Sequence, residues 1–115
     1  MNELRLKVTA NKLEAENDIF STSGSVNFDS CVFTFDSTWD DFEKYALFTF
    51  NNEDTVKVDI TNNRCNIPGL CMNYEGMLRI SVFGFNYTGV LITTNTVGHK
   101  IEEGVSDAKS WLKSD

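Results

Sequence analysis

Short segments in which apolar and polar residues alternate, separated by turn-forming residues, run along almost the whole chain. Leu4, Leu6 and Val8 alternate with polar neighbours, and residues 56–60 repeat the pattern. Because successive side chains of a β-strand point to opposite faces, this period of two predicts half-buried strands. About eight or nine short strands are predicted, with no alternation of strands and helices that would favour a parallel sheet. We therefore predict an all-β protein, an antiparallel β-sandwich.

Individual segments refine this prediction. Residues Tyr45–Phe50 are almost continuously apolar, which is typical of a central strand covered on both faces. Residues 21–25 are rich in serine and glycine and predict a loop, after which Val26–Phe28 is expected to begin the next strand. A short strand is expected to end at Pro68, and the loop from Pro68 to Gly76 is expected to hold one helical turn.

A tryptophan follows one predicted strand directly, in a segment that favours a short helical turn. Ser37 or Thr38 can cap a turn over Trp39–Tyr45, with aspartates placed early in it, where the helix dipole favours negative charge. Trp39 and Phe42 are three residues apart, so both can face the sheet and plug one end of the sandwich. We expect Trp39, Phe42 and Pro68 to be structural anchors.

The last ten residues differ in character from the rest of the chain. We expect one β-sandwich domain over residues 1–105 and a short helical tail over residues 106–115. Ser106 can serve as N-cap, and Trp111 and Leu112 fall on one apolar stripe. A helix of about two turns is not stable alone in water, so this stripe is expected to dock or fray. It can dock on its own sandwich or on a neighbouring chain.

Composition limits the classes of partner. The chain has 115 residues and a formal net charge of −7. Phosphate backbones and anionic membranes attract basic surfaces, so we expect neither nucleic acid as a partner nor membrane insertion. The apolar runs are too short to span a bilayer, and no secretory signal is expected at the N-terminus. Synthesis and folding in a cytosol are therefore expected.

The residues that usually carry chemistry form no recognisable motif. Three cysteines are an odd number in a chain without an export signal, so we expect buried free thiols and no disulfide framework. His99 is the only histidine, and we predict no catalytic, metal or cofactor site. The acidic segment from Asp36 to Glu43 resembles a loose calcium loop, but its spacing matches no EF-hand. A solvated acidic face is the simpler interpretation.

Aromatic residues leave a second interpretation open. Trp39 or Trp111, together with Tyr45, Tyr74 and Tyr87, could form a flat platform that stacks on sugar rings. Nothing in the sequence brings these residues together. Trp111, Leu112 and Tyr87 are the candidate interaction residues.

Several segments, taken in order, resemble a family of phage and prophage tail proteins from Gram-positive bacteria, related to the N-terminal domain of baseplate upper proteins. They cover residues 4–105 and comprise Leu6–Ala10, Thr22–Val26, Phe33–Trp39, Lys44–Phe48, Cys65–Pro68, Gly76–Gly84 and Ile101–Gly104. The resemblance implies a β-sandwich module of a tail tip or baseplate that acts in assembly and host attachment. It provides no catalytic residues. Family members often continue into segments that carry oligomerisation or receptor binding, whereas this sequence stops shortly after Gly104 apart from the Trp111 tail. This departure puts a direct receptor-binding role in doubt and leaves open an accessory or assembly protein.

These observations lead to two expectations of different classes. The first is a non-catalytic structural or interaction module of a phage or prophage tail, forming a homo-oligomer and binding other virion proteins. Such a protein would be made in the bacterial cytoplasm and become part of the virion. The alternative is a carbohydrate-binding module that contacts cell-wall glycans through exposed aromatic rings.

Overall fold

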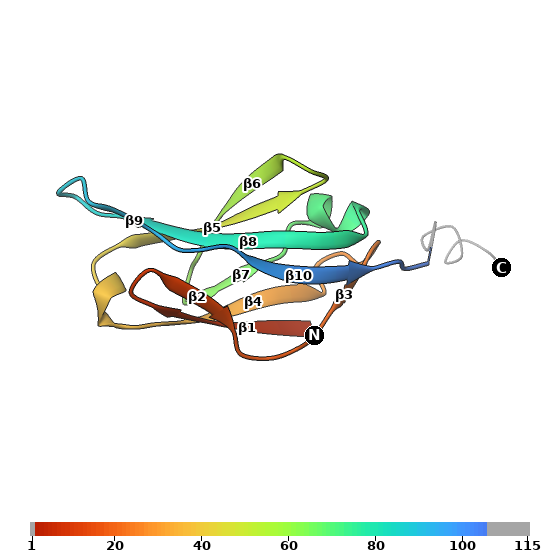
Figure 1. The fold of residues 1–115 in the computed structure, drawn as a ribbon, viewed down its shortest axis with the longest axis horizontal. Helices are drawn as coiled ribbons and strands as arrows, with labels where there is room; N and C mark the ends of the chain where they lie inside the picture. Colours follow the sequence, from red (N-terminus) through yellow and green to blue (C-terminus); the bar gives the residue numbers. More distant parts are fainter. Residues whose placement is uncertain (1, 106–115) are drawn as a thin grey trace.

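The computed structural model describes residues 2–105, which form two stacked β-sheets (Figure 1). The all-β fold class predicted from the sequence is confirmed, with ten strands where eight or nine were expected. The strands are β1 (Asn2–Thr9), β2 (Lys12–Ala15), β3 (Ser21–Thr22), β4 (Asp29–Phe35), β5 (Glu43–Phe50), β6 (Asp54–Asp59), β7 (Arg64–Asn66), β8 (Gly76–Phe85), β9 (Leu91–Thr93) and β10 (Val97–Glu102). The predicted C-terminal helix, with Trp111 and Leu112, lies outside the described residues.

The two sheets are mixed, which corrects the expectation of a purely antiparallel sandwich. One sheet has the order β2-β1-β4-β7, and the other has the order β3-β10-β8-β5-β6 with β9 paired to β8. Most neighbours are antiparallel, but β1 pairs with β4 and β10 with β3 in parallel. Parallel pairing needs a long crossover between partners, and residues 10–28 supply one between β1 and β4. Period-two alternation cannot distinguish the two directions, because it is the same in both.

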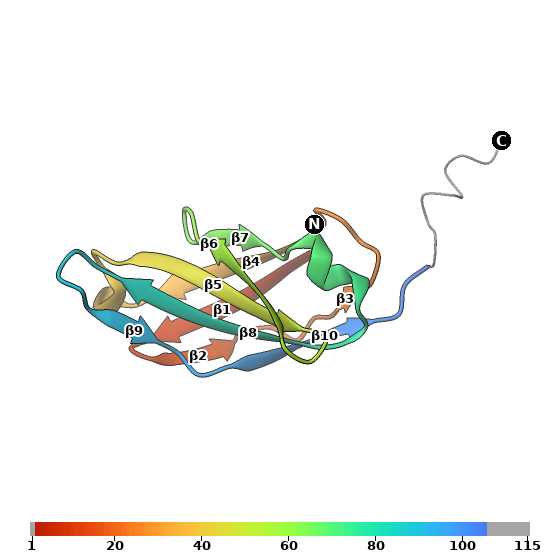
Figure 2. The same ribbon diagram turned by 90° about the horizontal axis from the view of Figure 1, so that it is seen from above.

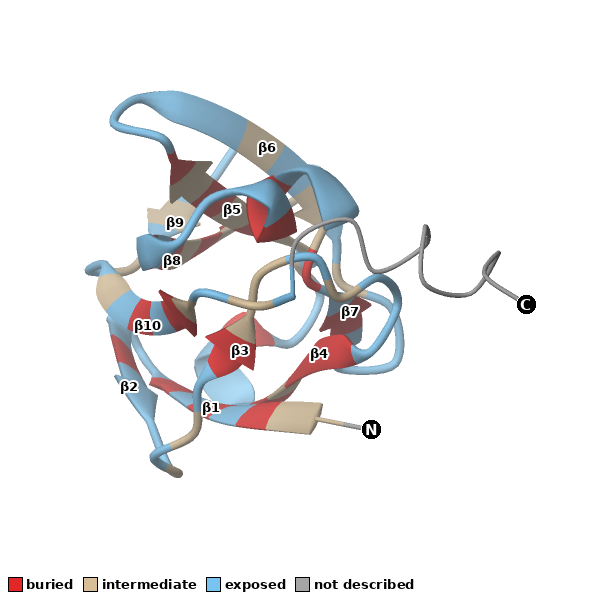
Figure 3. Cartoon of the chain, turned by 90° about the vertical axis from the view of Figure 1, so that its right-hand side faces the viewer, coloured by how far each residue is buried: buried red, intermediate tan, exposed pale blue. Residues whose placement is uncertain are grey.

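Apolar side chains from both sheets fill the space between them. Inward positions on the long strands are Leu4, Leu6 and Val8 on β1, Ala46, Phe48 and Phe50 on β5, and Leu78, Ile80 and Val82 on β8. Figure 3 shows buried positions alternating with exposed ones along β1. The sequence predicted this alternation for β1 and β8. It is not what was expected for β5, which was predicted to be covered on both faces. Only one face of β5 is buried, and its other side chains lie on the outer face of the six-stranded sheet.

The segment before β4 differs from the prediction. Ser21 and Thr22, expected in a loop, pair with β10, whereas Val26 and Phe28, expected to begin a strand, are exposed and β4 begins only at Asp29. Asn27 lies between them with a φ of 57°, a left-handed conformation that interrupts an extended strand. The two residues Ser21 and Thr22 become a strand because the edge of β10 is available to them.

Trp39 ends a short 3-10 helix over Ser37–Trp39, four residues before β5 begins. The predicted turn over Trp39–Tyr45 is therefore placed too late, and its cap is Asp36, which accepts a hydrogen bond from the Thr38 amide at 3.1 Å. The position of the indole is the one expected of a plug, and its role as a structural anchor stays a prediction. Trp39 is fully buried, and its Nε1–H donates to the carbonyl of Ala10 at 2.7 Å. Burial of the ring and the hydrogen bond together close one end of the sandwich.

The other two residues expected to be structural anchors are Phe42 and Pro68. Phe42 is half-buried, with its ring centroid 6.2 Å from that of Trp39. Pro68 follows β7 and caps a 3-10 helix over Gly69–Asn73, which is the helical turn expected in this loop. Cys71 and Met72 of that helix are buried in the core, so the loop closes part of the sandwich at the end opposite Trp39 (Figure 2).

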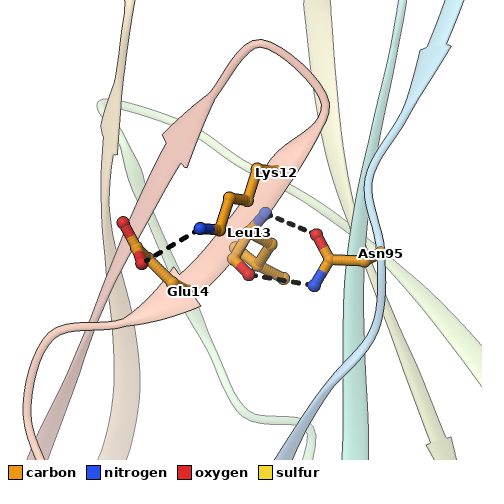
Figure 4. Close-up of polar contacts among 4 residues, drawn as sticks. All are labelled: Lys12, Leu13, Glu14 and Asn95. Carbon is orange, nitrogen blue, oxygen red and sulfur yellow. Dashed lines mark hydrogen bonds and ion pairs between the residues drawn. The ribbon is translucent and has the colours of Figure 1, made fainter.

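One asparagine joins the edges of the two sheets. Asn95 lies between β9 and β10, and its side-chain amide pairs with the backbone of Leu13 on the edge strand β2 (Figure 4). The Leu13 N–H donates to Asn95 Oδ1 at 2.7 Å, and Asn95 Nδ2 donates to the Leu13 carbonyl at 3.0 Å. The amide thus imitates a partner strand, which satisfies backbone groups of an edge that no other strand of residues 2–105 covers.

Candidate functional site: an exposed apolar surface

Apolar side chains gather on the outer face of the six-stranded sheet, where solvent would normally favour polar ones. The ladder places Tyr45 opposite Phe83, and Phe85 opposite Leu91, with all four side chains on the outer face. Leu47 continues the row along β5. We call these five residues, Tyr45, Leu47, Phe83, Phe85 and Leu91, the aromatic strip. Phe85 is 49% exposed and Leu91 62% exposed, so the strip opens to solvent toward the β8–β9 hairpin.

The strip's tyrosine ring is held between two neighbours. Its centroid lies 5.1 Å from that of Phe83 in a stacked arrangement, and Lys57 Nζ lies 4.6 Å from it. Because β5 lies between β6 and β8, Lys57 and Phe83 cover opposite faces of Tyr45. Its hydroxyl donates to Glu43 at 2.9 Å, and this hydrogen bond to a carboxylate is the largest cause that raises the pKa of Tyr45. Tyr45 therefore presents only its edge outward.

The strip ends at a well-ordered hairpin turn that displays a tyrosine. Asn86 Oδ1 accepts hydrogen bonds from the Thr88 amide, the Thr88 hydroxyl and the Val90 amide, at 3.1, 2.8 and 3.0 Å. These bonds hold the turn in one shape. Tyr87 stands at its tip, fully exposed at 102% of its reference area. A large aromatic side chain that is fully exposed on a rigid turn is typical of a contact residue.

The hairpin lies beside the acidic connection between β4 and β5, at the same end of the sandwich as Trp39 (Figures 1 and 2). A shallow pocket of about 190 Å³ lies between them. Its lining residues are Asp41, Glu43, Phe85, Asn86 and Tyr87, and we call it the hairpin pocket. It combines two aromatic rings with two carboxylates.

The structure brings together only part of the predicted set of interaction residues. Tyr87 is exposed as an interaction residue must be, but its predicted role as such stays a prediction. Trp39 is buried and cannot stack on a sugar ring. Tyr74 lies elsewhere, stacked on Phe50 with 5.5 Å between ring centroids. Trp111 and Leu112, candidate interaction residues expected to dock on their own sandwich or on a neighbouring chain, or to fray, lie outside the described residues.

No role was predicted from the sequence for two residues of the aromatic strip, Phe85 and Leu91. Phe85 continues the outward period-two positions of β8, which hold Arg79, Ser81 and Phe83. That periodicity was sufficient to predict its direction. The sequence could not predict in this way that Phe85 stands opposite Leu91. That pairing depends on the register of β9 against β8, which the length of the hairpin turn sets.

A buried chain of polar groups joins the two sheets at the other end of the sandwich. Ser21 donates to Asp29 at 2.9 Å, and its hydroxyl lies 2.7 Å from His99 Nε2. Since the single hydroxyl proton goes to Asp29, Ser21 accepts from His99, which must carry its proton on Nε2. A catalytic serine would instead donate to the histidine. Burial lowers the pKa of His99, and the negative charge of Asp29 opposes part of this effect.

The three cysteines are buried and free, as the sequence predicted. Cys31 and Cys65 stand directly opposite each other in the ladder between β4 and β7. The Cys65 thiol, through a hydrogen bond, and then burial raise the pKa of the Cys31 thiol well above its usual value. Residues 2–105 contain no group of three or more His, Cys, Asp or Glu side chains placed to hold a metal ion.

The fold defines a β-sandwich protein with an exposed apolar surface at one end. No protein-family model matches the chain, and no curated protein sequence matches it. Within the described part of the chain, no helix has the length and apolar character needed to cross a membrane.

Proposed function

We propose that this chain is a non-catalytic interaction module of a phage or prophage tail, belonging to its baseplate or host-attachment apparatus. Its partners are other virion proteins, including further copies of itself. The observation that carries the proposal is the aromatic strip, which continues to Tyr87 at the tip of the β8–β9 hairpin. Contiguous exposed apolar side chains of this kind mark protein-contact surfaces.

The position of the strip supports contact with another protein. Side chains on the outer face of a sheet lie outside the core and stabilise the fold only through cross-strand contacts of about 1 kcal/mol or less, so an aromatic row there is available to a partner. The strip is bordered by Lys57, Asp59 and Arg79 on the same face. An apolar centre with a polar rim is the usual composition of a protein–protein interface.

The phage setting rests on the ordered resemblance of segments between residues 4 and 105 to the baseplate upper protein family. Each segment is short, and the proposal uses their order. The sandwich fold agrees with the fold that the resemblance implies. Virion proteins occur in many copies held by symmetric contacts, which is why we include self-association.

The test is incorporation into tail particles with matched phenylalanine variants. Phe85→Ser alters the strip, whereas Phe20→Ser alters a phenylalanine of similar exposure, 52% against 49%, at the opposite end of the sandwich. Both variants, and the unchanged chain, are expressed in the source bacterium and tail particles are analysed by mass spectrometry. We expect the unchanged chain and Phe20→Ser in the particles, and Phe85→Ser reduced by about tenfold or more. Absence of the unchanged chain from the particles would reject the proposal.

A carbohydrate-binding module remains the second candidate, favoured by the fully exposed ring of Tyr87 beside Phe85. An exposed aromatic face can stack on a sugar ring while neighbouring polar groups bind its hydroxyls. The candidate no longer includes Trp39, which is buried, and both faces of Tyr45 are covered. Co-sedimentation with purified cell walls, lost in Tyr87→Ala and kept in Phe20→Ser, would support it.

A further inference from the structure

The hairpin pocket is built from two elements that lie far apart in the sequence. Glu43 and Phe85 stand opposite each other where β5 pairs with β8, and their side chains share the outer face. Asp41 precedes β5 with a φ of 66°, and Asn86 and Tyr87 follow β8. The pocket therefore has one acidic wall from the β4–β5 connection and one aromatic wall from the β8–β9 hairpin.

The hairpin and Glu43 are each held by internal hydrogen bonds. The three hydrogen bonds to Asn86 Oδ1 hold the hairpin, and the Tyr45 hydroxyl holds Glu43 at 2.9 Å. The Tyr45 bond uses one carboxylate oxygen, Oε2, and leaves Oε1 available. A site whose walls are already ordered needs little rearrangement when a ligand enters.

The acidic wall lacks an internal counter-charge. Across residues 2–105 the ion pairs are Lys12–Glu14, Arg64–Glu3 and Lys100–Glu102, and none involves Asp41 or Glu43. The nearest basic residue in sequence, Lys44, is directed elsewhere: its Nζ donates to the Phe42 carbonyl at 3.2 Å and lies 5.3 Å from the Phe35 ring centroid.

We propose that the hairpin pocket binds an arginine side chain of a partner protein. This inference rests on the proposed function and names the partner chemistry of the same surface. The planar guanidinium stacks on an aromatic ring and donates hydrogen bonds to carboxylates, which are the two kinds of group that line the pocket. The formal net charge of −7 also favours a basic partner surface.

Size and charge distinguish arginine from the other ligands. At about 190 Å³ the pocket is smaller than the roughly 300 Å³ at which pockets for drug-sized molecules begin, so it fits one side chain rather than an oligosaccharide. A neutral sugar would gain no charge attraction from the exposed carboxylates of Asp41 and Glu43. Lysine has the right charge, but its compact ammonium group lacks the planar face that stacks on Phe85 or Tyr87.

The test uses three small probes: N-acetyl-arginine amide, its neutral isostere N-acetyl-citrulline amide, and N-acetyl-lysine amide, which has an ammonium group and one more methylene. Each is titrated into the 15N-labelled protein while amide chemical shifts are recorded. We expect arginine to shift the amides of Asp41, Glu43 and Phe85–Tyr87 with a dissociation constant on the order of millimolar, as for one side chain acting alone. Lysine should bind several-fold more weakly, and citrulline should cause no saturable shift.

Variants locate the effect. Asp41→Asn combined with Glu43→Gln should weaken arginine binding by about fivefold or more, since both charges are removed while the new glutamine carbonyl can still accept from Tyr45. Asp59→Asn, another carboxylate of the same outer face but outside the pocket, is the matched control and should bind as the unchanged chain does. The same spectra report whether each variant is folded.

Equal shifts from citrulline and arginine, saturable shifts away from the pocket, or tighter binding of a cell-wall saccharide at the same amides would overturn the inference. Its failure is distinct from failure of the proposed function. If arginine does not bind while Phe85→Ser is still excluded from tail particles, the pocket inference is rejected and the interaction module stands. If arginine binds and the chain is absent from tail particles, the proposed function is rejected and the pocket inference stands.

Discussion

The indole ring of Trp39 lies directly against the backbone of Gly84, so that a Cβ at position 84 would stand 2.8 Å from Trp39 Cζ3. Gly84 is a buried, inward position on β8, one residue before the outward Phe85. The absence of a side chain there makes the space that the indole fills. The core and the exposed surface at this end of the sandwich are therefore formed by adjacent residues of one strand.

Gly84→Ala should destabilise the protein by about 1–3 kcal/mol, because the added methyl group forces the buried indole or the nearby Glu43 carbonyl to move. Urea unfolding monitored by tryptophan fluorescence measures the change. Gly69→Ala is the matched control, since a Cβ there meets nothing within 4 Å. Equal midpoints for the two variants would show that the indole is not held against Gly84.

Asn95→Ala should cost about 1–2 kcal/mol of unfolding free energy, because it removes both hydrogen bonds to the Leu13 backbone and leaves that edge without a partner. Hydrogen exchange should show faster exchange of the Leu13 amide in particular. The exposed Asn11 in the neighbouring β1–β2 turn provides the control variant Asn11→Ala. If the Leu13 amide exchanges equally fast in both variants, the pairing in Figure 4 does not protect the edge.

Stability should fall as the pH is lowered from about 7.5 to about 5.5, in part because of His99. Its pKa in the folded protein is lowered, chiefly by burial, so below its ordinary value of 6.5 the unfolded chain binds more protons than the folded one. The contribution of His99 to the free energy of unfolding is therefore fully present above pH 6.5, and it is lost as the pH falls from 6.5 toward the lowered pKa of the folded protein. Urea unfolding at several pH values should show a shallower dependence in His99→Gln, and an unchanged slope would contradict this account.

The thiols should react slowly in the folded protein. Burial raises the pKa of Cys71 to about 11 from 9.0, so at about pH 8 the thiolate is about a hundredfold scarcer than in the unfolded chain. Labelling with a thiol-specific reagent should be slow in buffer and complete in urea, with three thiols counted by mass. Rapid labelling of Cys71 without denaturant would show that the 3-10 helix Gly69–Asn73 opens easily.

Two phenylalanines on adjacent strands should differ sharply in their effect on stability. Phe48→Ala empties a buried position and should cost about 3–5 kcal/mol. Phe85→Ala removes a ring that is 49% exposed and loses only its cross-strand contact with Leu91, which is worth less than about 1 kcal/mol. Thermal and urea unfolding measure both. A large loss in Phe85→Ala would indicate that the strip serves the fold and not a partner.

For much of the candidate surface, the sequence predicts which face of the sheet a side chain points to. It does not predict which residues lie next to one another. Alternation along β8 predicts that Phe83 points away from the core, and it does. Alternation does not predict that Tyr45 stands opposite Phe83. Nor does it predict that Asp41 and Tyr87 line one pocket. Both contacts depend on how strands distant in the sequence align. The buried role of His99 was missed for the same reason, because its partners Ser21 and Asp29 come from two other strands.

By itself, the sequence determined the fold class, the position of most strands and the burial of the cysteines. Each of these follows from local periodicity, turn residues or the apolarity of one side chain. Only the tertiary structure decided the parallel pairing of β1 with β4, the place of the 3-10 turn at Ser37–Trp39 and the meeting of acidic and aromatic walls at one end. The physical reason is that pairing direction and register are properties of two segments together, and no single stretch of chain encodes both partners.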